Sequence, residues 1–235
     1  MKLAAAKSPR SAVGQQNLGA QFYEAERYDD ALSCYLRALK IRPKYPANLY
    51  GMGLTYTRMG DFVKAAEFYQ LAVATYPQFW KARVNLANSY HKLGRLEEAV
   101  ALYRTLVAEK PTENRLHANL GSALMKQGKL PAAMAEFGIV LAAEPNHAFA
   151  IENLGDALLR QGSIEPAADQ YVRTIELTPT NPNPYYKLGT IRQIQGRLDE
   201  AVELFQATIR INPQDDDASR RLQMAIQQRR DSASD

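Results

Sequence analysis

The side chains that carry out covalent chemistry or bind metal ions are few in this chain, and they stand apart. Its 235 residues include one cysteine, Cys34, and three histidines, His91, His117 and His147, with no two of them close in the sequence. A cysteine-based metal site needs at least two thiolates, and a nucleophile needs a neighbouring base. The sequence therefore predicts no metal site, no cofactor and no catalytic residue, so we do not expect an enzyme.

The acidic run Asp215, Asp216 and Asp217 has a structural explanation. Acidic residues at the start of a helix accept hydrogen bonds from free backbone N–H groups and interact favourably with the helix dipole. The run precedes a segment in which Leu222 and Ile226 have helical spacing. We therefore expect it to cap a helix rather than to bind a metal ion.

Asparagine recurs at a fixed spacing and indicates a different chemistry, the binding of a peptide backbone. Asn85, Asn119 and Asn153 follow one another at intervals of 34 residues, and Asn17 lies two intervals before the first of them. An amide side chain offers both a donor and an acceptor, as a peptide bond does. Amides repeated at each step of a regular structure would hold an extended chain with little regard for its sequence.

The asparagines belong to a repeat that runs through most of the chain. Six of the 12 prolines lie 34 residues apart without an insertion, namely Pro43, Pro77, Pro111, Pro145, Pro179 and Pro213. Taking this proline as position 32 defines six units: 12–45, 46–79, 80–113, 114–147, 148–181 and 182–215.

Other residue types keep the same register. Glycine stands at position 8 in five units and at position 15 in five units, alanine at position 20 in all six, and an aromatic residue at position 24 in all six. Glycine inside a helix favours close packing, and a left-handed glycine ends a helix. Each unit therefore predicts two helices of about 12–14 residues. Glu26 replaces the position-15 glycine of the first unit and is expected to loosen that turn, while Cys34, beside an expected core aromatic, is expected to be a buried structural thiol.

The 34-residue period, with Leu-Gly at positions 7 and 8, Ala at 20, an aromatic at 24 and Pro at 32, resembles the tetratricopeptide repeat family. The resemblance covers residues 12–215 and implies an all-α, right-handed superhelical α-solenoid of six helix-turn-helix repeats. Residues 1–11 are expected to be a poorly ordered leader or a helix extension. Residues 216–230 are expected to form a C-terminal capping helix, and 231–235 a frayed tail.

In this family the concave surface, formed by the first helix of each repeat, is the usual ligand-binding site. With 100° of rotation per residue, positions 2, 5, 6, 9, 12 and 13 share the exposed face of that helix. The residues that we expect to bind a peptide there are Asn17, Tyr23, Tyr50, Arg58, Lys81, Asn85, Asn88, His91, Lys92, Arg115, Asn119, Lys126, Asn153, Arg160 and Lys187.

Charge on the same face predicts the kind of peptide. Seven basic residues stand against three acidic ones, Glu24, Glu152 and Asp156, and a concave surface of one sign focuses its field. An extended, acidic protein or peptide segment is therefore the expected partner. The whole chain has a net charge of +4 with both signs mixed along it, unlike the concentrated charge of a nucleic-acid binder.

Residues 1–7 contain too short an apolar run for a secretory signal or a membrane helix. We therefore expect no direct membrane insertion and a cytoplasmic location, or a soluble domain of a larger protein.

These features favour a non-enzymatic scaffold or adaptor for protein–protein interaction that binds an acidic segment in its concave groove. Two alternatives stay open. The asparagine spacing resembles the ladder in the repeat arm of the O-linked N-acetylglucosamine transferases, which implies a substrate-recruiting arm of a larger enzyme. The first repeat also lacks a preceding cap, which would allow a self-assembling scaffold that forms homo-oligomers through that repeat. The family's clamp for acidic chaperone C-termini is absent, because no lysine stands at position 5.

Overall fold

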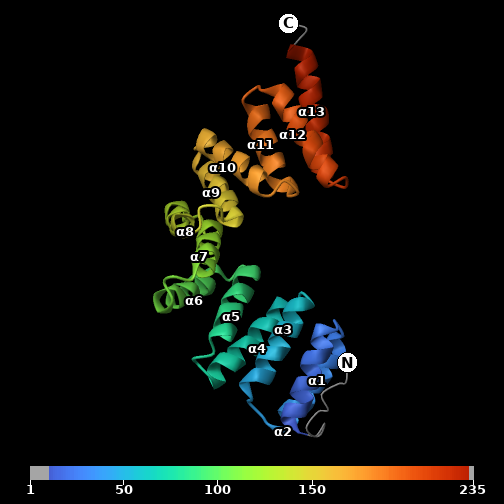
Figure 1. The fold of residues 1–235 in the computed structure, drawn as a ribbon, viewed down its shortest axis with the longest axis vertical. Coiled ribbons are helices and arrows are strands. Elements are labelled where there is room, and N and C mark those ends of the chain that lie inside the picture. The colour runs from blue at the N-terminus through green and yellow to red at the C-terminus, as the bar shows by residue number, and fades with distance from the viewer. Residues whose placement is uncertain (1–10, 233–235) are drawn as a thin grey trace. The chain divides into compact units, whose positions relative to one another are not determined.

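The structure, a computed structural model, describes residues 11–232, and every regular element among them is an α-helix (Figure 1). This is the all-α helical-repeat solenoid that the sequence predicts. Its helices are α1 (Ala12–Glu24), α2 (Tyr28–Ile41), α3 (Pro46–Arg58), α4 (Phe62–Thr75), α5 (Trp80–Lys92), α6 (Leu96–Glu109), α7 (Asn114–Lys126), α8 (Leu130–Ala143), α9 (Ala148–Gln161), α10 (Ile164–Leu177), α11 (Pro182–Ile194), α12 (Leu198–Ile211) and α13 (Asp216–Ser232). Most of the expected leader and the end of the expected tail lie outside the described residues.

The helices form two compact units that divide the chain inside α7. Unit 1 ends at Ala123 and unit 2 begins at Leu124, so the division falls within the fourth expected repeat and not between repeats. In unit 1, α1 packs on α2, α3 on α4 and α5 on α6, and each pair also contacts the next. Unit 2 repeats this arrangement with α9 on α10 and α11 on α12. The odd-numbered helices α1 to α11 are the first helices of their repeats, and the even-numbered ones are the second helices.

An aromatic ring that fills the space left by a glycine joins the two helices of a repeat. The Tyr69 ring on α4 is fully buried, and a Cβ atom added to Gly53 on α3 would lie 2.5 Å from its Cε1 atom. The same relation recurs in unit 2, where a Cβ on Gly189 would lie 3.0 Å from Cε1 of Phe205. The glycine at position 8 therefore permits the close approach that the sequence predicts.

The turn between the paired helices depends on one left-handed residue. Gly60, at φ +80°, occupies this place after α3, and glycine does so in the later repeats. Glu26 adopts the same conformation at φ +59°, and the turn closes with a 2.8 Å hydrogen bond from Arg27 N to the carbonyl oxygen of Phe22. The expectation of a looser first turn was wrong. A non-glycine residue in the left-handed conformation costs about 1–2 kcal/mol. The packing of the two flanking helices holds Glu26 in this conformation despite the cost.

The isolated cysteine and two of the three histidines have structural roles. Cys34 is buried, and burial raises the pKa of its thiol, which disfavours the reactive thiolate. His117 is buried with Nε2 2.9 Å from the carbonyl oxygen of Pro111, and His147 caps α9 by accepting a hydrogen bond from the backbone N–H of Ala150. Within residues 11–232 no three His, Cys, Asp or Glu side chains are grouped to hold a metal ion. No helix in that range is both long and apolar enough to cross a membrane.

Helix α13 covers the last helix pair of unit 2. Asp215 accepts a 2.9 Å hydrogen bond from the backbone N–H of Ala218, so the acidic run does cap this helix. Ala225 is fully buried in a cluster with Phe205 of α12. The helix continues beyond the expected end at residue 230, as far as Ser232.

The glycine–ring contact predicts opposite effects for two glycine-to-alanine changes. Gly53→Ala is expected to lower the free energy of unfolding by about 1–3 kcal/mol, because the new methyl group overlaps the Tyr69 ring. Gly138→Ala, in the exposed middle of α8, meets no atom within 4 Å and is expected to raise it by about 0.5–1 kcal/mol. Urea unfolding followed by circular dichroism measures both. Equal effects of the two changes would contradict the role given to the contact.

Removal of residues 216–235 is expected to cost unit 2 about 2–3 kcal/mol, since it re-exposes the large apolar side chains around Phe205. Thermal unfolding and light scattering measure the loss of stability and any aggregation. Met224→Ser is the control, because this α13 side chain is exposed in the intact chain. A truncated chain as stable and as monomeric as the control would show that α13 is not a cap.

Candidate functional site

Amide side chains on neighbouring first helices of unit 1 are joined by hydrogen bonds. Asn119 on α7 donates from Nδ2 to Oδ1 of Asn88 on α5, at 3.1 Å. Asn85, one turn before Asn88, donates from Nδ2 to the hydroxyl of Tyr50 on α3, at 3.2 Å. Residues from three consecutive first helices therefore form one polar row, which we call the amide row: Tyr50, Asn85, Asn88 and Asn119.

A core residue fixes the orientation of the amide row. Tyr103, the position-24 aromatic of α6, is fully buried, and burial raises the pKa of its hydroxyl. This hydroxyl donates to Oδ1 of Asn88 at 2.5 Å. The Asn88 oxygen thus accepts from both Tyr103 and Asn119, which defines which end of the amide is oxygen and which is nitrogen. The sequence did not single out Tyr103 as part of the site.

The amide row keeps unused hydrogen-bonding capacity of both kinds. Nδ2 of Asn88 makes no hydrogen bond with any residue in the described range, and the same holds for Oδ1 of Asn85 and of Asn119. One donor group and two acceptors thus lie on adjacent helices. A peptide segment in extended conformation presents the complementary N–H and C=O groups.

A cavity of about 360 Å³ adjoins the amide row in unit 1. Its lining combines four predicted residues with four that the sequence analysis missed: Tyr50, Lys81, Asn85 and Arg115, and Trp80, Val84, Glu113 and Leu116. Trp80, the single tryptophan, is at position 1, outside the positions that helical geometry assigned to the concave face. Glu113 precedes α7 in the connecting loop. Trp80 therefore lies off the assigned face of α5 and Glu113 lies outside the helices, so the helical periodicity selected neither residue.

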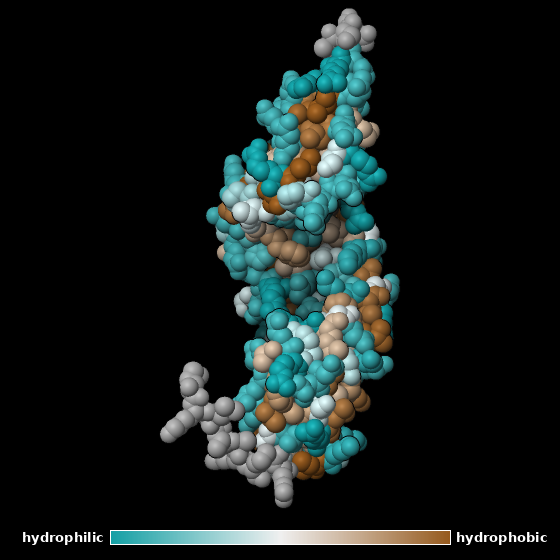
Figure 2. All heavy atoms as spheres, turned by 90° about the vertical axis from the view of Figure 1, so that its right-hand side faces the viewer, coloured by the Kyte–Doolittle hydropathy of each residue, from teal (hydrophilic) through white to brown (hydrophobic). Residues whose placement is uncertain are grey.

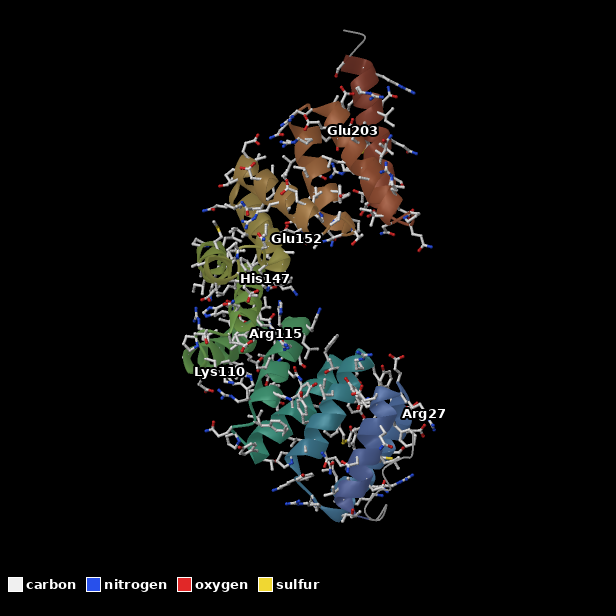
Figure 3. All side chains as sticks on the ribbon, viewed as in Figure 1. Arg27, Lys110, Arg115, His147, Glu152 and Glu203 are labelled. Carbon is white, nitrogen blue, oxygen red and sulfur yellow. The ribbon has the colours of Figure 1, made fainter. Side chains whose placement is uncertain are left out.

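Three basic residues on the first helices of unit 1 have no ion-pair partner among the described residues. Lys81, Lys92 and Arg115 are exposed and form no ion pair with any residue in the described part of the chain. Arg115 lies near the start of α7 (Figure 3), close enough for its charge to lower the pKa of Tyr50, although burial raises that pKa more strongly. Arg83, by contrast, is held by the Glu109 carboxylate at 2.7 Å. Unit 1 therefore offers unneutralised positive charge next to the amide row.

The N-terminal part of unit 1 lacks this combination. Arg58 is paired with Glu26 at 3.2 Å, and Tyr23 packs against Tyr28. Asn17 is exposed on α1 and His91 is half-buried on α5. Position 6 of the second repeat is Gly51, where a Cβ would lie 2.6 Å from the Tyr35 ring. Core packing therefore interrupts the predicted asparagine series at this repeat.

In unit 2 the corresponding polar groups are bonded to one another. Lys187 on α11 contacts Glu152 at 2.9 Å and Asp156 at 2.7 Å, both on α9. The Tyr171 hydroxyl donates to Asp156 at 2.8 Å. Burial lowers the pKa of Lys187, but the two carboxylates raise it more, so the lysine stays charged. Lys187 was predicted to bind the peptide, and the structure shows it in an ion-pair cluster with Glu152 and Asp156.

The other predicted site residues of unit 2 differ in whether they are bonded to the rest of the protein. Asn153 donates from Nδ2 to the carbonyl oxygen of Phe149 in its own helix, at 2.7 Å. Arg160 donates to the backbone of Met125 at 2.9 Å and lines a smaller cavity of about 200 Å³. Lys126 is exposed. The charged groups on the predicted face of unit 2 are thus more fully paired with other groups of the protein than those of unit 1.

Surface hydropathy gives no large alternative site on the face shown in Figure 2. Hydrophilic side chains cover most of that face, and hydrophobic ones appear in separate patches. Another cavity of unit 1, about 470 Å³, is lined by Leu39 of α2, Leu49 of α3 and Leu71 of α4 among others. It contains one basic residue, Lys44, and no amide.

Three family models match the chain. One described as Tetratricopeptide repeat matches residues 56–123, one described as TPR repeat matches 19–60 and 155–193, and a further Tetratricopeptide repeat model matches 182–215. Together they span residues 19–123 and 155–215. The matches follow the repeats that the prolines and glycines define.

Solved structures of other proteins resemble the fold of this chain at low sequence identity. PilW, described as a widely conserved type IV pilus biogenesis factor, superimposes with a TM-score of 0.76 at 21% identity, over 92% of this chain and 98% of its own. YrrB, described as a TPR protein with an unusual peptide-binding site, does so with 0.65 at 20% identity, over 74% and 89%. These likenesses show the fold alone.

A curated relative matches a shorter stretch. The BBSome complex member BBS4 of Xenopus tropicalis is 32% identical over 75 residues, which are 32% of this chain and 14% of that protein. The match thus spans a small part of the relative's length. The repeat-by-repeat matches, the helix pairs and the glycine–ring packing agree, and the chain belongs to the tetratricopeptide repeat family.

Proposed function

We propose that this protein is a non-enzymatic interaction scaffold that binds an extended segment of a partner protein on the first helices of unit 1. The observation that carries the proposal is the amide row beside unpaired basic groups. The row offers one donor group and two acceptors that no residue in the described range uses. The fold is that of protein-interaction scaffolds, in agreement with this role.

The main chain of the partner would supply the complementary groups. A carbonyl oxygen of the segment would accept from Nδ2 of Asn88, and backbone N–H groups would donate to Oδ1 of Asn85 and Asn119. Because these bonds involve only the peptide backbone, they give affinity without selecting a sequence. Each is worth about 0.5–1.5 kcal/mol net, so several are needed.

Acidic side chains of the partner would be attracted by Lys81, Lys92 and Arg115. These bases are exposed, so each pair with a partner carboxylate adds at most about 1 kcal/mol and is weakened by salt. The proposal is narrower than a groove along all six repeats. In unit 2 a ligand would first have to break the contacts of Lys187 with Glu152 and Asp156.

Loss of two amides is expected to weaken binding of a peptide selected against the intact chain from a display library. The double change Asn85→Ala and Asn119→Ala should cost about 1–3 kcal/mol, since the two hydrogen bonds to Oδ1 of these residues disappear, at about 0.5–1.5 kcal/mol each. Isothermal titration calorimetry gives the dissociation constants. Asn153→Ala is the matched control, because this amide bonds to its own helix. Equal binding by the double variant and the control would place the ligand elsewhere.

Tyr103→Phe tests whether the core hydroxyl positions Asn88. The change removes the 2.5 Å bond to Oδ1 and leaves the ring in place, as the phenylalanines Phe137 and Phe205 show at the same position of other repeats. Affinity for the selected peptide is expected to fall by about 0.5–1.5 kcal/mol while helix content stays unchanged. Tyr171→Phe is the control, since its hydroxyl donates to Asp156 in unit 2 and not to the amide row. An unchanged affinity in the Tyr103 variant would remove the positioning role.

A further inference from the structure

The cavity beside the amide row has the size of a subsite for one side chain. At about 360 Å³ it is near the lower end of the range for ligand pockets, about 300–1,000 Å³. Its aromatic walls contact other side chains: the Tyr50 ring packs against Phe79 at 4.9 Å and Tyr69 at 5.8 Å, and Nζ of Lys110 lies 4.2 Å from the ring centre of Trp80. A ligand side chain would meet preformed walls, which reduces the entropy lost on binding.

The lining of the cavity is apolar on one part and basic on another. Tyr50 and Trp80 supply aromatic surface, with the almost fully buried Val84 and Leu116 beneath them, and burying an apolar side chain against the rings is favourable. Lys81 and Arg115 lie in the same lining, on successive first helices, and neither forms an ion pair with a residue in the described range. A ligand that uses the whole lining therefore needs an apolar group and an anionic group close together.

The charge of the lining favours a single negative charge. Lys81 and Arg115 contribute two positive charges, and Glu113 contributes one negative charge that neither of them neutralises by direct contact. The net charge of +1 complements a carboxylate. A phosphate group carries up to two negative charges, and the Glu113 carboxylate would repel it.

The course of the amide row indicates whether this carboxylate belongs to a side chain or to the C-terminus of the partner. Asn85 lines the cavity and also begins the row that continues to Asn88 and Asn119. A segment that enters the cavity and bonds to the row must extend past the cavity. A side-chain carboxylate within the segment meets this condition more readily than a chain end does.

We infer that the cavity formed by α3, α5 and α7 is a specificity subsite that takes one bulky apolar side chain of the partner, while Lys81 and Arg115 bind an Asp or Glu side chain next to it. This inference rests on the proposed function, because it assigns a sequence preference to a segment whose backbone the amide row holds. The partner motif is thus an acidic residue adjacent to a large apolar residue, inside an extended stretch. Lys92, on the same helix but outside the cavity lining, has no part in this preference.

Four labelled peptides of one length test the motif by fluorescence anisotropy with the full chain. The parent contains Glu next to Trp in a Gly/Ser background and is amidated; the others replace Glu by Gln, replace Trp by Ala, or place Glu-Trp at a free C-terminus. The parent is expected to bind about tenfold more tightly than the Gln and Ala peptides, with the preference for Glu decreasing as salt is raised. The free C-terminus is expected to give no advantage over the parent.

Variants of the protein test which residues recognise the acidic residue of the motif and which recognise the apolar one. Lys81→Gln with Arg115→Gln should abolish the preference for Glu over Gln, and Trp80→Ala should abolish the preference for Trp over Ala. Lys40→Gln, at an exposed lysine of α2 outside the cavity lining, should leave both. A parent peptide that binds no better than the Gln peptide, or binds only with a free C-terminus, would overturn the inference. So would tighter binding of a phosphoserine peptide than of the Glu peptide.

The outcomes also separate this inference from the proposed function. If all four peptides bind alike and the change of Asn85 and Asn119 to Ala weakens all of them, the scaffold role stands and the subsite fails. If no peptide binds and the amide variant also leaves library-selected binding unchanged, both fail. Circular dichroism of each variant confirms that it is folded before its affinity is interpreted.

Discussion

Close contact between a position-24 ring and a position-8 glycine is the constraint on which the rest of the structure depends. The ring occupies the volume that a side chain on the glycine would fill, as Tyr69 does at Gly53 and Phe205 does at Gly189. Because the two helices approach so closely, a tyrosine at this place extends across the first helix of its repeat. Its hydroxyl then reaches the exposed face of that helix, so the contact that builds the core also arranges the polar surface.

In two repeats the tyrosine hydroxyl bonds to a different residue on the exposed face, with different results. In unit 1 the Tyr103 hydroxyl donates to Asn88 and thereby orients an amide that has capacity left for a ligand. In unit 2 the Tyr171 hydroxyl donates to Asp156, whose carboxylate is also held by Lys187. Position 8 is Ala87 in the first case and Gly155 in the second, yet each tyrosine hydroxyl reaches the residue at position 9, and that residue decides the result. A surface difference between the units therefore arises from single substitutions on a common framework.

The helices and their packing follow from local and periodic signals, so the sequence predicts them well: the prolines mark the period, and glycine at positions 8 and 15 marks a close contact and a turn. The site is predicted only in part. Lys187 is 35 residues from Glu152, and they meet because successive first helices lie side by side with a particular offset. Counting the charges along one helix face treats Lys187 and Glu152 as groups that do not interact. Trp80 and Glu113 lie at a helix start and in a loop, where helical periodicity carries no information.

The comparison of the two units also explains why repetition of a residue type does not repeat a binding function. A ligand that binds unit 1 replaces water at Asn85, Asn88 and Asn119, and the cost of that exchange is small. A ligand that binds the Lys187 cluster replaces protein contacts at 2.7–2.9 Å in a half-buried setting, where removing one partner strands the others. Polar groups that already satisfy each other stabilise their own unit and are poor ligands for a partner. Binding capacity is therefore found where the framework leaves donors, acceptors and charges without internal partners.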